Sequence, residues 1–290
     1  MIWGTTYLAL RIAVAHFPPF LFIAIRQTIA GLLLAGFVLT IGKAKWPSFE
    51  YIRRQAIAGF FMISMGNGLV AWAEVHIPSG VAAIICSLMP VVVILMNLAI
   101  SKDEKPNVLI LLGAAIGLAG IVMIFGEHIR EFSKTEYLLA IIVTFVGVMC
   151  WAGGSIWLKK HSGETNPFLN AGLQMLFGGL WLIPFSLIFD DLSLVRWSAE
   201  AAYSMVYLII FGSIVAYACY SYALRKLPMT IVSLYAYVNP LVAVILGWLV
   251  LDEKLNMNVG VAIVLTIAGI YIVNRGYHLR DAWRAQFSDR

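Results

Sequence analysis

Long apolar runs separated by short polar turns make up nearly the whole chain. The runs do not alternate between apolar and polar positions with a period of two, which is the pattern of membrane strands. Many approach the roughly 20 residues that a helix needs to cross a bilayer. Proline falls at or near the start of several runs, where a missing backbone N–H costs least. We predict ten transmembrane helices near 1–15, 19–41, 55–74, 79–100, 107–125, 137–158, 167–189, 203–224, 229–250 and 257–274.

The composition excludes a soluble domain. Hydrophobic residues make up 61% of the 290 residues and charged residues only 12%, against about 25% charged in soluble domains. We therefore predict an all-α, multi-pass protein of the inner (plasma) membrane, with the lipid bilayer as a partner. The first run is short and opens at Met1, so we expect the native N-terminus to extend before this residue.

The distribution of lysine and arginine predicts the orientation, because these residues favour cytoplasmic segments. If the N-terminus is inside, fourteen lie in inner segments and four in outer ones. The inner ones are Lys43, Lys45, Arg53, Arg54, Lys102, Lys105, Lys159, Lys160, Arg225, Lys226, Arg275, Arg280, Arg284 and Arg290. The outer ones are Arg130, Lys134, Arg196 and Lys254. Both termini are predicted to be cytoplasmic, with 276–290 as a basic tail.

The sequence repeats itself at a spacing of about half its length. The tripeptide Asp-Glu-Lys occurs at 103–105 and at 252–254, and Trp3 has its counterpart in Trp151. A duplicated unit of five helices explains this spacing. Because five is odd, the second copy enters the membrane upside down.

The predicted domains are therefore a first five-helix repeat, 1–125, and an inverted second repeat, 137–275. Inverted repeats are typical of secondary transporters, in which one site near the midplane opens alternately to the two sides.

Several motifs carry a family resemblance over essentially the whole chain. They are "WGTTYLALRIAV", "PPFLFIAIRQTIAGLLL" with its Arg26, "IPSGVAAIICSLMPVVVIL", the "DEK" turn and "GLAGIVMIF", together with their second-half echoes. The chain resembles the EamA-type branch of the drug/metabolite transporter superfamily. The resemblance implies ten helices in two inverted repeats and the movement of small metabolites, often the export of amino acids or related compounds. The chain departs from the pattern in "AWAEVHIPSG", which contains Glu74.

Two arginines fall within predicted spans. Arg26 is expected to face a cavity, a cluster of carbonyls or a partner, because an unpaired charge in the membrane is costly. Its repeat counterpart is Gln174, so the symmetry is broken there, as a site for an asymmetric ligand requires. Arg11 lies nearer the outer end of its span, and we expect it to extend toward the membrane surface.

Glu74 is the only acidic residue placed within a predicted span. Three interpretations remain open: binding of a substrate amine, proton transfer together with His76, or a solvated helix end. The other fourteen acidic residues lie in turns or tails, so the simplest hypothesis is transport without proton coupling. A proton-coupled exporter that uses Glu74 is the alternative.

Uncharged in-span residues complete the predicted substrate site. The amides of Asn67 and Asn239 need hydrogen-bond partners from a helix or a ligand. Pro90 and Pro240 are predicted hinges, because a proline in a membrane helix leaves a carbonyl free. Four aromatic residues lie where the repeat brings related stretches together, and we expect them to form a pocket wall: Trp3, Trp151, Tyr220 and Tyr235.

Other functional classes lack their residues. The three cysteines lie inside apolar runs without metal-ligand spacing, so we expect no metal or cofactor. An intramembrane enzyme would need a cluster of chemically active side chains and a channel a filter or charged rings; we see neither, and no basic patch for nucleic acid. Gly113 and Gly117 form a GxxxG motif, which predicts close helix packing, either within a monomer or in a homodimer.

Overall fold

The computed structural model describes residues 2–100, 107–127, 135–161, 166–251 and 257–288. These residues form helices joined by short turns, and none of them lies in a strand. The Asp-Glu-Lys turns fall outside the described residues. In the first half, the helices are α1 (Ile2–Val14), α2 (Pro19–Thr40), α3 (Phe49–Gly59), η1 (Phe60–Asn67), α4 (Gly68–His76), α5 (Ser79–Cys86), α6 (Met89–Ile100) and α7 (Val108–Glu127).

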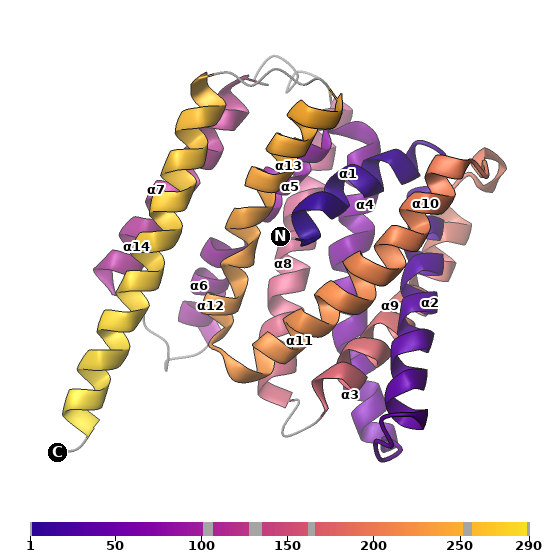
Figure 1. The fold of residues 1–290 in the computed structure, drawn as a ribbon, viewed down its shortest axis with the longest axis horizontal. Coiled ribbons are helices and arrows are strands. Elements are labelled where there is room, and N and C mark those ends of the chain that lie inside the picture. The colour runs from indigo at the N-terminus through magenta and orange to yellow at the C-terminus, as the bar shows by residue number, and fades with distance from the viewer. Residues whose placement is uncertain (1, 101–106, 128–134, 162–165, 252–256, 289–290) are drawn as a thin grey trace.

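The second half follows the same order (Figure 1). Its helices are α8 (Thr135–His161), α9 (Pro167–Phe189), η3 (Leu192–Leu194), α10 (Ala199–Tyr207), η4 (Leu208–Val215), α11 (Ala216–Lys226), α12 (Met229–Ser233), α13 (Tyr235–Leu251) and α14 (Met257–Ser288).

Five helices among the described residues are long and apolar enough to cross a membrane. They are Pro19–Thr40, Phe49–His76, Thr135–His161, Pro167–Phe189 and Ala199–Lys226. Ile2–Val14 and Val108–Gly120 are shorter apolar helices. The chain is therefore an all-helical membrane protein within this part, and the full count of ten spans stays a prediction.

Two predicted spans, 79–100 and 229–250, are each divided into two helices. The first breaks at Ser87 and Leu88, and the second at Leu234. A break at membrane depth frees backbone carbonyls and N–H groups, and such backbone is tolerated only inside the protein or beside a cavity. The breaks therefore mark the interior of the molecule.

Two long helices share a feature that the sequence analysis did not predict. Phe49–His76 contains the π-helical segment η1, and Ala199–Lys226 contains the π-helical segment η4. The two segments are of equal length and begin 148 residues apart, at Phe60 and Leu208. Each segment has eight residues, and π-helical segments within α-helices are frequent at functional sites.

Helix starts follow local chemistry. Ser48, Asn166 and Ser198 accept hydrogen bonds from backbone N–H groups at the starts of α3, α9 and α10, which satisfies donors that have no intrahelical partner. Pro18 precedes α2 and offers no such acceptor. The Asp190 carboxylate at the end of α9 replaces it, 2.7 Å from the Leu21 N–H.

Glycines set the distance between the helices that pack most closely. A Cβ on Gly31 of α2 would lie 2.2 Å from the Leu176 backbone nitrogen of α9. A Cβ on Gly113 of α7 would lie 2.7 Å from the Val273 nitrogen of α14. The GxxxG motif is therefore used for packing within this chain. Figure 1 shows α7 beside α14 at one edge, away from α2 and α9.

Candidate functional site

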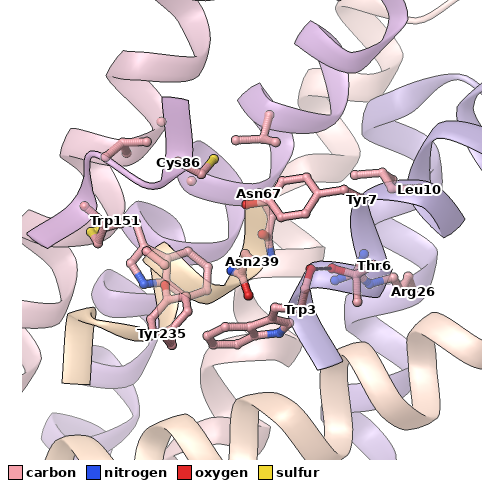
Figure 2. A pocket seen from close by; sticks show the side chains of 16 residues that line it. Trp3, Thr6, Tyr7, Leu10, Arg26, Asn67, Cys86, Trp151, Tyr235 and Asn239 are labelled. Carbon is pink, nitrogen blue, oxygen red and sulfur yellow. Dashed lines mark hydrogen bonds between the residues drawn. The ribbon is translucent and has the colours of Figure 1, made fainter. Parts of the chain in front are cut away.

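A central cavity lies between helices from both halves of the chain. Sixteen residues line it, from α1, α2, η1, α4, α5, α6, α8 and α13 (Figure 2). Six of the eight predicted substrate-binding residues are among them: Trp3, Arg26, Asn67, Trp151, Tyr235 and Asn239. Tyr220 lies directly behind this wall, and Glu74 is not part of the lining.

Aromatic rings form one end of the cavity. The Trp3 ring centroid lies 4.7 Å from that of Tyr235, 5.3 Å from that of Tyr220 and 5.7 Å from that of Trp151. The Trp3 ring is nearly perpendicular to that of Trp151, at 88°. Edge-to-face contacts of this kind are favourable between aromatic rings. The four aromatic residues selected from the sequence therefore form one cluster.

Tyr220 positions this cluster without lining the central cavity. Its hydroxyl lies 2.7 Å from Ser155 Oγ and accepts a hydrogen bond of 3.3 Å from Trp151 Nε1. Both partners belong to α8, so the hydrogen bonds join α11 to α8. The Trp151 indole therefore has a fixed orientation toward the cavity.

The π-helical segments contact the same two tryptophans. Trp3 Nε1 donates a 2.9 Å hydrogen bond to the Gly212 carbonyl in η4. A Cβ on Gly66 in η1 would lie 2.9 Å from Trp151 Cε3. Each tryptophan thus packs on the π-helical segment of the other half of the chain.

Arg26 is the charged residue of the cavity wall. Its side chain is buried, with 5% exposed, and Nε donates a 3.0 Å hydrogen bond to Ser213 Oγ of η4. No described residue accepts a hydrogen bond from its two terminal amino groups. Because a buried guanidinium needs compensation, these groups are available to a ligand.

Gln174, the repeat counterpart of Arg26, has a different environment. Its Nε2 donates to Gln55 Oε1 at 2.6 Å, and its Oε1 accepts from the Tyr217 hydroxyl at 2.5 Å. It is fully buried and does not line the cavity. The two equivalent positions therefore differ in structure, one closed by side-chain hydrogen bonds and one open to a cavity.

The two predicted amides meet at the same cavity. Asn67 ends η1, and Asn239 lies on α13 with 2% of its surface exposed. The Asn239 Oδ1 atom is buried and has no hydrogen-bond partner among the described residues. In Figure 2 both amides lie between Arg26 at one end and Tyr235 at the other.

The structure corrects the interpretation of Glu74 as a solvated helix end. Its side chain is 0% exposed, and neither carboxylate oxygen has a hydrogen-bond partner in the described part of the chain. It is therefore not a solvated helix end, and it makes no hydrogen bond to His76, which packs on the Trp72 ring instead. The packing of α4 against α1 and α8 removes this residue from water.

Arg11 has partners within the protein, and its expected extension toward the membrane surface stays a prediction. Its Nη1 donates to the backbone carbonyl of Glu74 and lies 3.5 Å from the carbonyl of Ile77. The Glu74 carbonyl belongs to the last turn of α4 and Ile77 directly follows this helix, at an end where a cation is favoured by the helix dipole. Arg11 thus joins α1 to the end of α4.

The two prolines lie differently in their helices. Pro90 is the second residue of α6, directly after the break at Ser87 and Leu88, whereas α13 continues through Pro240. A proline cannot donate to the carbonyl four residues earlier. The carbonyls that lose a donor in this way are those of Cys86 and Ala236, and both residues line the cavity. The hinge function itself stays a prediction.

A second pocket lies on the other side of the aromatic wall. It shares Trp3, Tyr235 and Asn239 with the central cavity. Its remaining lining residues are Ile2, residues of α11 and α12, and Leu227 between these two helices. Cys219 is one of the residues that α11 contributes. Trp3 and Tyr235 therefore separate two hollows.

Sequence reasoning missed several lining residues, among them Tyr7, Leu10 and Cys86. A signal was present for the first two, because Trp3, Tyr7 and Leu10 follow the three- and four-residue spacing of one helix face. Cys86 gave no signal of its own. Among the described residues, no group of three or more His, Cys, Asp or Glu side chains is arranged to hold a metal ion.

Comparison with known proteins identifies the family of this chain. The model of the EamA-like transporter family matches residues 1–126 and 138–275. The inner membrane transporter YedA of Escherichia coli (strain K12) is 32% identical over 285 residues, covering 97% of this chain and 90% of YedA. Protein PecM of Dickeya dadantii (strain 3937) is 28% identical over 275 residues, covering 94% and 88%.

The fold also has a counterpart among solved structures. One crystal structure superposes with a TM-score of 0.72 at 18% identity, and the match covers 94% of this chain and 95% of the other. At this identity the likeness concerns the fold alone.

These findings confirm the family resemblance and the localisation predicted from the sequence, a multi-pass protein of the inner membrane. They also indicate a transporter rather than an enzyme. The match to both stretches of the chain and the identity to YedA lead to one conclusion: this chain belongs to the EamA-like transporter family.

Proposed function

We propose that the chain is a secondary transporter that moves small metabolites by alternating access through the central cavity. The observation that carries this proposal is the meeting of Arg26, Asn67 and Asn239 at one cavity, with polar groups that no described residue satisfies. Pockets with a few convergent polar groups and an aromatic wall are typical of small-molecule sites.

The proposed architecture is ten membrane helices in two inverted repeats, 1–125 and 137–275, with a basic tail at 276–290 and both termini in the cytoplasm. The family match in two stretches and the equivalent π-helical segments support it. Exchange of conformation between such halves would expose one site to each side in turn.

In this proposal, Trp3 and Tyr235 form the inner barrier. Under the predicted orientation, the second pocket lies toward the cytoplasmic ends of α1, α11 and α12. The two rings stand between this pocket and the central cavity. Separation of the Trp3 and Tyr235 rings, together with a tilt of α6 at Pro90 and of α13 at Pro240, would open the cavity to the cytoplasm.

The substrates are proposed to be amino acids or related compounds, moved outward. Transport without proton coupling is the simpler mechanism, because Glu74 does not line the cavity. A proton-coupled exporter remains the second candidate, favoured by the complete burial of this carboxylate.

Counterflow in proteoliposomes tests the proposal. A panel of labelled amino acids and other metabolites is offered to vesicles preloaded with the same unlabelled compound. We expect saturable counterflow for at least one compound, and its loss in Arg26→Ala. Flux that does not saturate and shows no counterflow would indicate a channel instead.

A further inference from the structure

The central cavity has a charge imbalance that a ligand can remove. Arg26 is the only charged residue among the sixteen that line it, and none of the sixteen is acidic. A site for a substrate whose ammonium group is held by a carboxylate would need an acidic wall residue. The described lining offers a cation and neutral groups.

The charged groups behind the wall do not reverse this imbalance. Glu74 lies near Arg26. A second cation, Arg11, also lies close to Glu74, because it donates a hydrogen bond to the Glu74 backbone carbonyl. With Glu74 ionised, the three side chains carry a net charge of +1, and with Glu74 protonated they carry +2. The sign is positive in either protonation state. An unbalanced charge in a low-dielectric interior is costly, so a ligand with one negative charge is favoured.

The opposite end of the cavity selects the body of the ligand. Trp3 and Trp151 stand at 88° to each other and Trp3 and Tyr235 at 63°, so their rings form a corner. A flat ring placed in such a corner gains edge-to-face contacts in addition to apolar burial. Figure 2 shows Arg26 at one end and Trp151 and Tyr235 at the other, with Asn239 between them.

We infer that the substrate is a small organic anion with an aromatic or flat apolar body, bound by its carboxylate at Arg26 and by its ring against Trp3, Trp151 and Tyr235. A positive charge on the substrate is not required. Asn67 and Asn239 hydrogen-bond the polar groups that lie between the two ends. This inference rests on the proposed function of the cavity as the substrate site, and it narrows the proposed amino acids and related compounds to carboxylates with an aromatic or flat apolar body.

The test is a ligand series of constant skeleton, measured by thermal unfolding of the purified full-length chain in detergent. The compounds are 3-phenylpropanoate, 3-phenylpropan-1-ol and 3-phenylpropylamine, which share the phenyl ring and three-carbon chain and have an anionic, a neutral and a cationic head group. Two further probes, 3-cyclohexylpropanoate and acetate, replace or remove the ring. Because ligands that bind only the folded protein raise its unfolding midpoint, apparent affinities follow from the concentration dependence.

We expect 3-phenylpropanoate to bind about tenfold or more tightly than the alcohol and the amine, as for the loss of one charge-assisted hydrogen bond. Acetate should not bind in the same range, and 3-cyclohexylpropanoate should bind more weakly than the phenyl compound. Arg26→Gln should lose the preference for the carboxylate, while Arg26→Lys should retain part of it. Arg54→Gln is the matched control, since Arg54 pairs with Glu50 at the surface.

Equal or tighter binding of the amine would overturn the inference, and so would no binding by any of the five compounds. The wild-type series needs no variant, so a misfolded Arg26→Gln leaves the test intact. Binding is read in detergent and transport in vesicles. A chain that binds 3-phenylpropanoate but gives no counterflow for any compound would contradict the proposed function while supporting the class of ligand.

Discussion

Two kinds of buried polar side chain are important for the site: those hydrogen-bonded within the protein, and those with polar groups left open to the cavity. Gln174 belongs to the first group, with hydrogen bonds to Gln55 and Tyr217. Arg26 and Asn239 belong to the second. An unsatisfied buried polar group costs free energy, so such residues persist where a ligand satisfies them.

At the residue scale, Glu74→Gln separates the two coupling mechanisms. The substitution removes a buried titratable carboxyl group and keeps the shape of the side chain. The test uses a substrate whose charge does not change over the tested pH range. If transport is uncoupled, an imposed pH gradient should not concentrate this substrate in vesicles that contain either the wild type or the variant. Counterflow should also agree within about twofold, since the carboxylate does not line the cavity and groups without a direct ligand contact contribute little to binding. Accumulation driven by the gradient in the wild type, and lost in the variant, would show proton coupling through Glu74.

Helix pairs depend on glycine where their backbones meet. In α2, Gly31 faces the backbone of α9, whereas a Cβ on Gly36 would meet nothing within 4 Å. The same helix therefore contains a glycine that packing requires and one that it does not.

At the element scale, Gly31→Ala should destabilise the protein and Gly36→Ala should not. A Cβ at Gly31 would lie 2.2 Å from a backbone nitrogen, so the helices must separate, which costs about 1–3 kcal/mol or more. Alanine at position 36 should instead stabilise the helix by roughly 0.5–1 kcal/mol. Thermal unfolding of the purified variants measures both changes. Equal midpoints for the two variants would contradict the close packing of α2 on α9.

In the described part of the chain, two hollows lie on opposite sides of one aromatic wall, and a cysteine lines each of them. Cys86 lines the central cavity and Cys219 the second pocket. In the proposed orientation the second pocket faces the cytoplasm, so these thiols report on the two sides of the barrier.

We expect a membrane-impermeant maleimide to label Cys219 in inside-out vesicles and to label Cys86 slowly from the same side. Two single-cysteine variants are used. Both carry Cys150→Ser, and one also lacks Cys86 while the other also lacks Cys219. Trp3→Ala removes part of the barrier and should increase the rate at Cys86 about tenfold or more, whereas Trp181→Ala, at an exposed position of α9, should not. The estimate assumes a barrier of at least about 1.4 kcal/mol. Equal Cys86 rates in the wild type and Trp3→Ala would exclude Trp3 as a barrier.

The orientation of the whole molecule is testable at its C-terminus. The predicted fourteen-to-four excess of inner lysine and arginine predicts that residue 290 lies in the cytoplasm. A cytoplasmic reporter fused there should be active and a periplasmic reporter silent. The reverse pattern would contradict the count of ten spans or their direction.

The sequence by itself determined the membrane class, the positions of the main helices and six of the sixteen cavity-lining residues. Apolar runs fix helices because a backbone in lipid must satisfy its own hydrogen bonds, and α2 and α9 begin at Pro19 and Pro167 as predicted. In-span polar residues identified the site because burial without a partner is costly, which is why Arg26 and Asn239 were found.

Only the tertiary structure decided which side chains face one another. Glu74 and Arg26 are both in-span charges, yet one is enclosed and the other lines the cavity. The partner of Arg11, the break at Leu234 and the cavity position of Cys86 likewise came from the packing of helices distant in sequence. The physical reason is that composition fixes a helix locally, whereas its rotation and its neighbours depend on contacts between residues far apart in the chain.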